Sequence, residues 1–195
     1  MEIVATAIPE VKVIRPKRFG DHRGFFAEVY NRRAFETAGL RFDFVQDNHS
    51  LSAQRGTLRG LHYQSPPFAQ TKLVRVLKGR ILDVAVDIRQ GSPTFGRHVA
   101  VELSAEGFEQ LLVPKGFAHG FVTLEDDVEV FYKVDAYYSA AHDHGIAWND
   151  PDLAIDWPVS PVECVLSAKD AAQPAFAGLP AHFTYVPVAS ATATA

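Results

Sequence analysis

The feature that most constrains the fold is a strict two-residue alternation in short segments. In ILDVAVDI, residues 81–88, every second side chain is a large aliphatic one, and Asp83 and Asp87 lie on the other face. HVAVELS, residues 98–104, repeats the pattern with its large apolar side chains inward. A period of two residues is typical of a β-strand with one face against a core. Further strands are expected at residues 11–15, 25–30, 42–47, 57–64, 72–77, 109–113, 118–124 and 128–134.

Turn-forming residues separate these segments and leave little room for helix. RQGSPTFG and SAEG are rich in residues that favour tight turns. One helix is expected at residues 31–39, with Asn31 as its N-cap and Gly39 as its stop. From about Trp148, proline, aspartate and serine become frequent, which predicts loops and a short helix wrapped around the sheets. So many short strands predict an all-β sandwich or barrel.

Length and composition limit the kinds of protein this chain can be. A chain of 195 residues with 47% hydrophobic content suits one domain, placed at residues 1–185, and residues 186–195 are expected to form a frayed low-complexity tail. The net charge is −4 without a basic run, so no nucleic-acid partner is expected. No apolar stretch could cross a membrane, and no signal-peptide pattern opens the chain. Cys164 is the only cysteine, which suits a cytoplasmic location.

The segment TLRGLHYQ, residues 57–64, places charged side chains within an apolar strand. Alternation alone would put Arg59 and His62 on opposite faces. Gly60 could host a β-bulge that turns both side chains inward. A packed core histidine, with an arginine that reaches to solvent, would also explain the segment.

Other polar residues share the inward faces of predicted strands. Tyr132 alternates with the valines of VEVFYKV, and Lys72 lies on the same face as the two valines of KLVRV. A lysine that faces a core is rare without a partner or a task. His119 follows a Pro–Gly turn. Together with Arg59 and His62, these residues predict a polar cavity that holds water or a ligand.

Two segments resemble cupins, which are double-sheet jelly-roll barrels. PKGFAH, residues 114–119, resembles the second cupin motif, and residues 62–79 resemble the first. Metal-binding cupins carry a second histidine where this chain has Gln64, and no suitably spaced glutamate follows. Because glutamine is a poor ligand for transition metals, no metal site is expected. The histidines are then available for proton chemistry.

Six segments in order resemble the dTDP-4-dehydrorhamnose 3,5-epimerase family. The resemblance extends to about residue 174. The segments are FGDHRGFFAEVYN (19–31), FVQDNHS (44–50), RGLHYQ (59–64), VDIRQGSPTFG (86–96), VPKGFAHGF (113–121) and LSAKDAAQP (166–174).

This resemblance implies a homodimeric cupin that needs no cofactor. Its reaction would invert C3 and C5 of dTDP-4-keto-6-deoxyglucose to give dTDP-4-keto-L-rhamnose, in dTDP-L-rhamnose biosynthesis. Each carbon adjoins the 4-keto group, so loss of its proton gives an enolate, and inversion requires a proton from the opposite face. Such a site needs a base, an opposed acid and a cation near the oxyanion.

The resemblance also assigns roles to individual residues. His62 corresponds to the base, Asp170 to the carboxylate that orients it, Tyr132 to the acid and Lys72 to the cation near the keto oxygen. Arg59 and His119 are expected to contact the substrate. For the nucleotide, the matching positions are Arg23, Glu28, Gln46, Asp47, Asn48, Asp143 and Lys169. Arg23 suits a pyrophosphate clamp, because its planar guanidinium can bond two phosphate oxygens.

Aromatic residues and the sheet edges leave two further points open. Phe19, Phe26 and Tyr138 could stack on the thymine or the sugar, but core packing explains them equally well. An isolated jelly roll leaves strand edges exposed, and exchange of an N-terminal strand in a homodimer could cover them.

Three alternatives to the double epimerase remain at this point. A sugar-nucleotide epimerase that inverts one carbon would share the barrel and the His–Asp pair. A metal-dependent cupin oxygenase is disfavoured by Gln64. A non-catalytic binding module would retain Arg23 but would not need His62, Asp170 and Tyr132 together.

Overall fold

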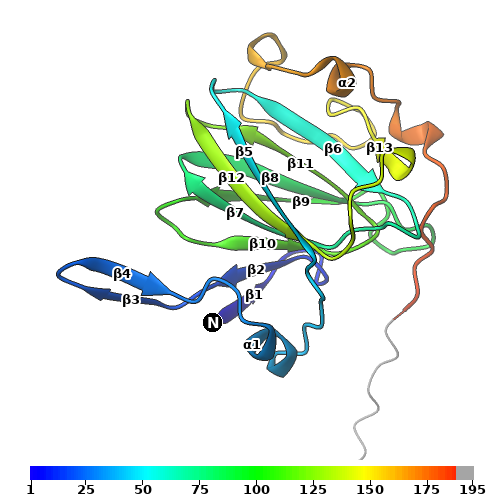
Figure 1. Cartoon of the computed structure of the whole chain (residues 1–195). Helices are drawn as coiled ribbons and strands as arrows, with labels where there is room; N and C mark the ends of the chain where they lie inside the picture. Colours follow the sequence, from blue (N-terminus) through cyan, green and yellow to red (C-terminus); the bar gives the residue numbers. More distant parts are fainter. Residues whose placement is uncertain (188–195) are drawn as a thin grey trace, which may run out of the picture.

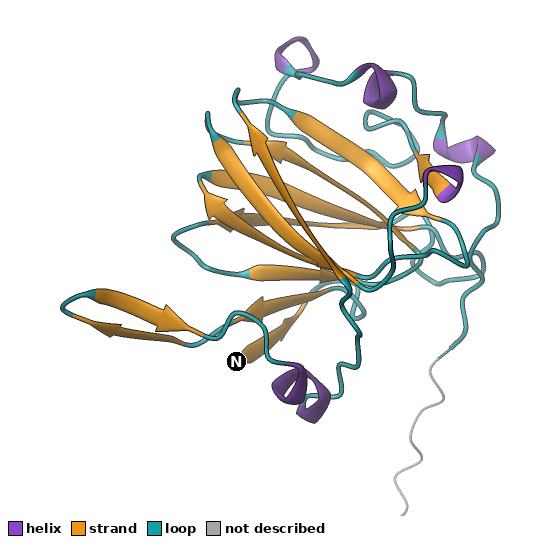
Figure 2. Cartoon of the chain, in the orientation of Figure 1, coloured by secondary structure: helices purple, strands orange, loops and turns teal. Residues whose placement is uncertain are grey.

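Two antiparallel sheets and a projecting hairpin make up the protein in a computed structural model that describes residues 1–187 (Figures 1 and 2). The larger sheet has the strand order β1-β2-β10-β7-β12-β5, and the smaller one has the order β13-β6-β11-β8-β9. All pairs of named strands are antiparallel. The prediction of an all-β fold of two sheets is confirmed.

The elements have the following bounds. The larger sheet contains β1 (Glu2–Ala5), β2 (Lys12–Arg15), β5 (Gln46–Ser52), β7 (Lys72–Lys78), β10 (Gln110–Val113) and β12 (Val128–Val134). The smaller sheet contains β6 (Leu58–Gln64), β8 (Arg80–Asp87), β9 (His98–Ser104), β11 (Phe117–Thr123) and β13 (Asp143–Gly145). The hairpin is β3 (Arg18–Asp21) with β4 (Gly24–Ala27), and the helices are α1 (Arg32–Thr37) and α2 (Ala168–Ala171). Short 3₁₀ turns cover Ala140–His142, Pro161–Glu163 and Phe176–Gly178.

Strand β8 is buried on both faces. Ile81 and Ala85 pack into the core between the sheets, whereas Val84 and Val86 pack with Leu153 from the C-terminal segment. Alternate side chains of β8 therefore point to opposite faces as predicted, but both faces are covered by other parts of the chain. Because the C-terminal segment covers the outer face, the aspartate face of this strand becomes the inner one.

The C-terminal segment confirms the predicted wrap. Trp148 and Val159 join an apolar cluster with Leu58 and Val122, which lie on the smaller sheet. Figure 1 shows the segment passing along the outside of β6 before it descends toward the C-terminus. Of the predicted frayed tail, residues 188–195 lie outside the described residues. The placement of one domain at residues 1–185 stays a prediction.

Helix α1 has the predicted N-cap, since Asn31 Oδ1 accepts a hydrogen bond from the Ala34 amide at 3.2 Å. The expected strand at residues 42–47 is wrong over most of its length, because β5 begins only at Gln46. Phe42 and Phe44 instead pack in an aromatic cluster around Tyr30.

Three short strands were not expected from the sequence. They are β1, β3 and β13, each of three or four residues. No helix in residues 1–187 is long and apolar enough to cross a membrane.

A bulge in β6 sets the orientation of the polar side chains on this strand. His119 of β11 pairs with His62, but two residues further on Phe121 pairs with Arg59, so β6 holds one extra residue. Gly60 lies there with a φ of 132°, and its Cα faces the Gly120 backbone. A Cβ at Gly60 would lie 2.5 Å from Gly120 Cα. The predicted bulge is confirmed, and both Arg59 and His62 line the same cavity.

We predict that Gly60→Ala destabilises the protein by about 1–3 kcal/mol or more, because the new side chain meets backbone and the positive φ is strained. The midpoint of chemical denaturation measures the change. The control is Gly178→Ala, where an added Cβ meets nothing within 4 Å. Equal stability of the two variants would contradict the role assigned to Gly60.

Candidate active site

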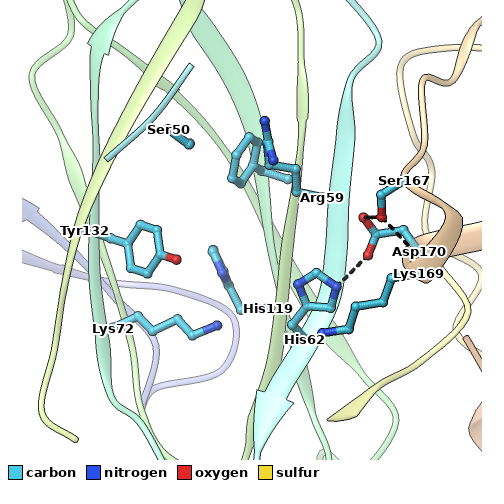
Figure 3. Close-up of a pocket in the computed structure, with 10 residues that line it drawn as sticks. Ser50, Arg59, His62, Lys72, His119, Tyr132, Ser167, Lys169 and Asp170 are labelled. Atoms are coloured by element: carbon cyan, nitrogen blue, oxygen red, sulfur yellow. Dashed lines mark hydrogen bonds and ion pairs between the residues drawn. The ribbon is translucent and has the colours of Figure 1, made fainter. Parts of the chain in front are cut away.

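One cavity of about 280 Å³ is lined by strands of both sheets and collects most of the predicted polar residues (Figure 3). Strands from both sheets and helix α2 contribute to it. Its lining consists of Ser50 from β5, Arg59 and His62 from β6, Lys72 from β7, His119 and Phe121 from β11, Tyr132 from β12, and Ser167, Lys169 and Asp170 at α2.

His62 and Asp170 form a hydrogen-bonded pair between the barrel and helix α2. His62 Nε2 donates to Asp170 Oδ1 at 2.5 Å, and Ser167 Oγ donates to Asp170 Oδ2 at 2.8 Å. Burial by itself raises the pKa of the Asp170 carboxyl, but the bonds from His62 and Ser167 outweigh it, and the pKa falls below its ordinary value. Asp170 is therefore an ionised carboxylate that holds His62. With Nε2 engaged, Nδ1 is the ring nitrogen left for proton transfer.

Tyr132 and Lys72 come from adjacent strands and lie across the cavity from His62 (Figure 3). Burial raises the pKa of the Tyr132 phenol, and Asp143 adds to this, whereas Arg59 opposes it. Tyr132 is thus a protonated phenol near neutral pH. Burial also lowers the pKa of Lys72 to about 8, although Asp83 and Asp143 act in the opposite direction. Lys72 is therefore a cation close to its titration point.

His119 is held by a second carboxylate. Its Nε2 donates to Asp83 Oδ1 at 2.6 Å, and both side chains are buried. Burial lowers the pKa of His119 below its ordinary value, against the influence of Asp83, so the ring is neutral near pH 7. Asp83 was not among the predicted site residues. The available signal was an aspartate inside an apolar strand. The sequence placed Asp83 on one face of β8 but did not say whether that face was the inner or the outer one.

Ser167 is another residue that the sequence reading did not select. Its hydroxyl caps α2, because Oγ accepts a hydrogen bond from the Asp170 amide at 3.0 Å, and the same hydroxyl donates one to the Asp170 carboxylate. The serine three residues before Asp170 in SAKD is the N-cap pattern that could have indicated it.

Several predicted nucleotide-binding residues form a rim beside the cavity. The Asp143 carboxylate accepts hydrogen bonds from Lys169 Nζ at 2.5 Å and from the Tyr138 hydroxyl at 2.9 Å. Gln46 donates to Asn48 Oδ1 at 2.8 Å and accepts from the Tyr138 amide. Because Gln46 and Asn48 share the face of β5 that carries Ser50, this rim is continuous with the cavity.

Asp47 lies on the other face of β5, where Lys133 Nζ donates to it at 2.8 Å. Its side chain is therefore not directed into the cavity. Gln64 is also turned away from a metal-binding role: its amide bonds the backbone carbonyls of Phe68 and Tyr137 and the Ser139 amide. Within residues 1–187, no three His, Cys, Asp or Glu side chains are grouped so as to hold a metal ion.

Within one chain, neither Arg23 nor Glu28 lines the cavity. Arg23 lies at the turn of the β3–β4 hairpin, pairs with Asp21 and has a side chain 78% exposed. Figure 1 shows this hairpin projecting away from both sheets. Glu28 accepts a hydrogen bond from Asn31 and lines a separate groove near α1. Their predicted contact with substrate stays a prediction.

A barrel with a His–carboxylate pair, a partly buried lysine and an opposed phenol has the groups that acid–base catalysis needs, and the comparisons with known proteins place it in the cupin-like sugar-nucleotide epimerase class. A family model described as dTDP-4-dehydrorhamnose 3,5-epimerase matches residues 5–178. The chain belongs to the dTDP-4-dehydrorhamnose 3,5-epimerase family, and it is an isomerase. The family predicted from the sequence is confirmed.

Individual relatives are similar over almost the whole chain. A dTDP-4-dehydrorhamnose 3,5-epimerase of Sinorhizobium fredii is 53% identical over 188 residues, which are 96% of each chain. A Legionella pneumophila dTDP-6-deoxy-D-glucose-3,5-epimerase, solved with dTDP-4-keto-L-rhamnose, is 48% identical with a TM-score of 0.91 over 95% of this chain and 99% of that one. A Bacillus anthracis dTDP-4-dehydrorhamnose 3,5-epimerase, solved with TDP and pyrophosphate, is 53% identical with a TM-score of 0.86 over 89% and 98%.

Proposed function

We propose that this protein inverts C3 and C5 of dTDP-4-keto-6-deoxyglucose to form dTDP-4-keto-L-rhamnose, a step of dTDP-L-rhamnose biosynthesis. The observation that carries the proposal is the placement of two proton-transfer groups on opposite sides of one cavity. The His62–Asp170 pair lies on one side, and the Tyr132 hydroxyl lies on the other (Figure 3). A sugar ring between them would meet a base on one face and an acid on the other.

His62 is the proposed base. Its Nδ1 takes the proton from the carbon next to the keto group, and the Asp170 carboxylate stabilises the imidazolium that forms. The bond between Nε2 and Asp170 keeps the ring in the tautomer that leaves Nδ1 free to accept this proton.

Lys72 and Tyr132 complete the proposed reaction. Loss of the proton places negative charge on the 4-keto oxygen, and a cationic Lys72 in a desolvated cavity stabilises this charge strongly. Tyr132 then gives its phenolic proton to the opposite face of the carbon, which inverts it. The phenolate regains a proton from solvent, and His62 releases its proton. These steps require only side chains of the protein, and we expect no cofactor.

The rim of Gln46, Asn48, Asp143 and Lys169 is the proposed binding site for the dTDP group. Its amides, its carboxylate and its ammonium can bond the base and the phosphates. Asp47 would contribute through its backbone, since its side chain faces Lys133. Arg59 and His119 would contact the sugar from the cavity wall.

A second copy of the chain is proposed to bring Arg23 and Glu28 to the substrate. The hairpin carries Phe19, Phe25 and Phe26, which are 53, 60 and 66% exposed. An apolar projection of this kind favours burial against a partner. A homodimer in which each hairpin reaches the partner's cavity would bury these rings and place Arg23 on the pyrophosphate. A cytoplasmic location is the compartment expected for this enzyme.

The test of the proposed reaction is incubation with dTDP-4-keto-6-deoxyglucose in heavy water, followed by NMR of the sugar. We expect deuterium at both C3 and C5 without added metal, because each of these carbons adjoins the keto group. Incorporation at one carbon would favour the single-carbon epimerase. A requirement for a divalent ion would contradict the mechanism that uses side chains alone.

His62→Ala and Tyr132→Phe should separate the base from the acid. His62→Ala removes the base and should abolish both deuterium exchange and product. Tyr132→Phe keeps the ring, so His62 can still exchange a proton on one face, while product formation falls by about 10²–10⁴-fold. Solvent exchange and product are followed by NMR.

Tyr137→Phe is the matched control, because Tyr137 is 66% exposed and does not line the cavity. All variants should retain dTDP binding and an unchanged circular dichroism spectrum. Near wild-type inversion by Tyr132→Phe would remove this tyrosine from the mechanism.

Arg23→Ala should raise the Michaelis constant with little change in kcat, because a phosphate clamp binds ground and transition states alike. Loss of a charge-assisted contact costs about 1.5–3 kcal/mol, so KM should rise about 10–100-fold. Arg33→Ala, on the exposed surface of α1, is the control. Steady-state kinetics measure both.

Mixing Arg23→Ala chains with His62→Ala chains tests whether the hairpin acts on the partner's cavity. A mixed dimer would then have one cavity with both changes and one with neither, so activity measured at substrate concentrations near the wild-type KM, where Arg23→Ala is nearly inactive, should rise on mixing. If the hairpin serves its own chain, every cavity carries one change and mixing restores nothing.

A further inference from the structure

Asp83 is a completely buried carboxylate with only one of its oxygens in use. Oδ1 accepts from His119 Nε2 at 2.6 Å, whereas Oδ2 has no hydrogen-bond partner in the described part of the chain. It is the one buried side-chain polar atom without a partner among residues 1–187. An unsatisfied buried carboxylate oxygen is unfavourable unless a nearby positive charge compensates for it.

The position of Asp83 in the sheet directs it toward the active cavity. On β8 it lies in register with Phe121 of β11, and its bond to His119 crosses diagonally to the next inward position of that strand. Both Phe121 and His119 line the cavity. Asp83 therefore stands directly behind the cavity wall, without forming part of the lining itself.

Lys72 is the partly buried cation that lines the same cavity as His119, and the negative charge of Asp83 favours its protonated form. Among the charges acting on Lys72, Asp83 is the largest that favours the charged form, followed by Asp143, while Lys169 opposes it. The other titratable or charged groups around the same cavity are Arg59, His62, His119, Tyr132 and Asp170. Most of these groups are cationic or neutral near neutral pH, and Asp170 is already committed to His62 and Ser167. Asp83 thus places behind this wall a negative charge of which one oxygen holds His119 and the other has no hydrogen-bond partner among the described residues.

We propose that Asp83 is a positioning residue for the epimerase reaction: one carboxylate oxygen holds the His119 ring, and the charge on the other keeps Lys72 cationic inside the cavity. The inference rests on the proposed function, in which a cationic Lys72 stabilises the enolate oxygen. It gives the cavity two histidine–carboxylate pairs with different tasks. Asp170 supports a base, whereas Asp83 supports a cation and a substrate contact.

The proposal predicts a direction of change with pH. Lys72 must carry its proton to stabilise the enolate, so activity falls as the pH rises through the pKa of Lys72, which is about 8. Asp83→Asn removes the charge that raises this pKa but keeps a side chain of the same shape that can still accept from His119. Lys72 should then lose its proton at lower pH, by about one pH unit or more, as expected for the loss of a nearby opposite charge.

The experiment follows Lys72 directly in protein labelled with [ε-¹³C]lysine, without substrate. Lys72→Met identifies the Lys72 signal by its absence. We expect the titration midpoint of Lys72 to fall by about one pH unit or more in Asp83→Asn, and the alkaline limb of kcat/KM to shift by the same amount. An unchanged Lys72 midpoint overturns the proposal. If the wild-type protein had no epimerase activity but Asp83→Asn still shifted the Lys72 midpoint, the proposed function would be refuted and the coupling of Asp83 to Lys72 would stand.

Asp87→Asn is the matched control for the loss of a buried carboxylate. Asp87 lies four residues further along β8 on the same face, is equally buried, and bonds Arg89, Ser92 and Thr94 outside the active cavity. This variant should lower stability without moving the Lys72 midpoint or the alkaline limb. An equal shift in both variants would show a general effect of strand destabilisation and would overturn the proposal.

A measurement on the wild-type protein decides the question if Asp83→Asn does not fold. With ¹³Cγ-labelled aspartate, a carboxylate coupled to Lys72 shows a chemical-shift step with the midpoint of the Lys72 titration. That step should be absent in Lys72→Met. If no buried aspartate signal follows the Lys72 titration, the proposal is wrong.

Discussion

The hydrogen bond between His62 and Asp170 joins two parts of the chain that are 108 residues apart, and the active cavity depends on it. His62 belongs to the barrel, and Asp170 belongs to a four-residue helix in the C-terminal segment. The apolar cluster of Leu58, Val122, Trp148 and Val159 holds that segment against the smaller sheet. Packing that is remote from the cavity therefore places the carboxylate, and the carboxylate sets the tautomer of the base.

Burial has opposite consequences for the proposed acid and the proposed cation, which lie on the same side of the cavity. It favours the neutral forms of Tyr132 and Lys72, which keeps the acid protonated but works against the cation. A cation in such a place needs an anion that does not neutralise it by direct contact. A carboxylate behind the wall, as Asp83 is, stabilises the charge at a distance and leaves the ammonium available to a substrate oxygen.

The projecting hairpin carries a different kind of constraint. Its aromatic side chains and Arg23 are folded away from the cavity of their own chain. Phe25, next to the turn of the hairpin, packs edge-to-face against Phe108, and the Arg18 guanidinium lies over the same ring, so the hairpin is anchored to the body of the chain. An anchored arm with an exposed apolar surface suits association between two copies better than closure over its own site.

The resemblance to a known family supplied most of the polar residues that line the cavity, but not Ser167. The sequence by itself determined most of the strand pattern, the helix at Asn31 and the bulge at Gly60. These features depend on local chemistry: a two-residue alternation, a side-chain cap and a glycine with access to positive φ. The start of β5 was misplaced because Phe42 and Phe44 find aromatic partners that no local pattern reveals. Only the tertiary structure decided which face of β8 is the inner one, because that depends on whether the C-terminal segment covers the other. For the same reason only the folded chain showed that Asp83 stands behind the cavity wall and that Arg23 lies far from the cavity of its own chain. Distances between residues that are remote in sequence are set by tertiary packing, and no local sequence pattern reports that packing.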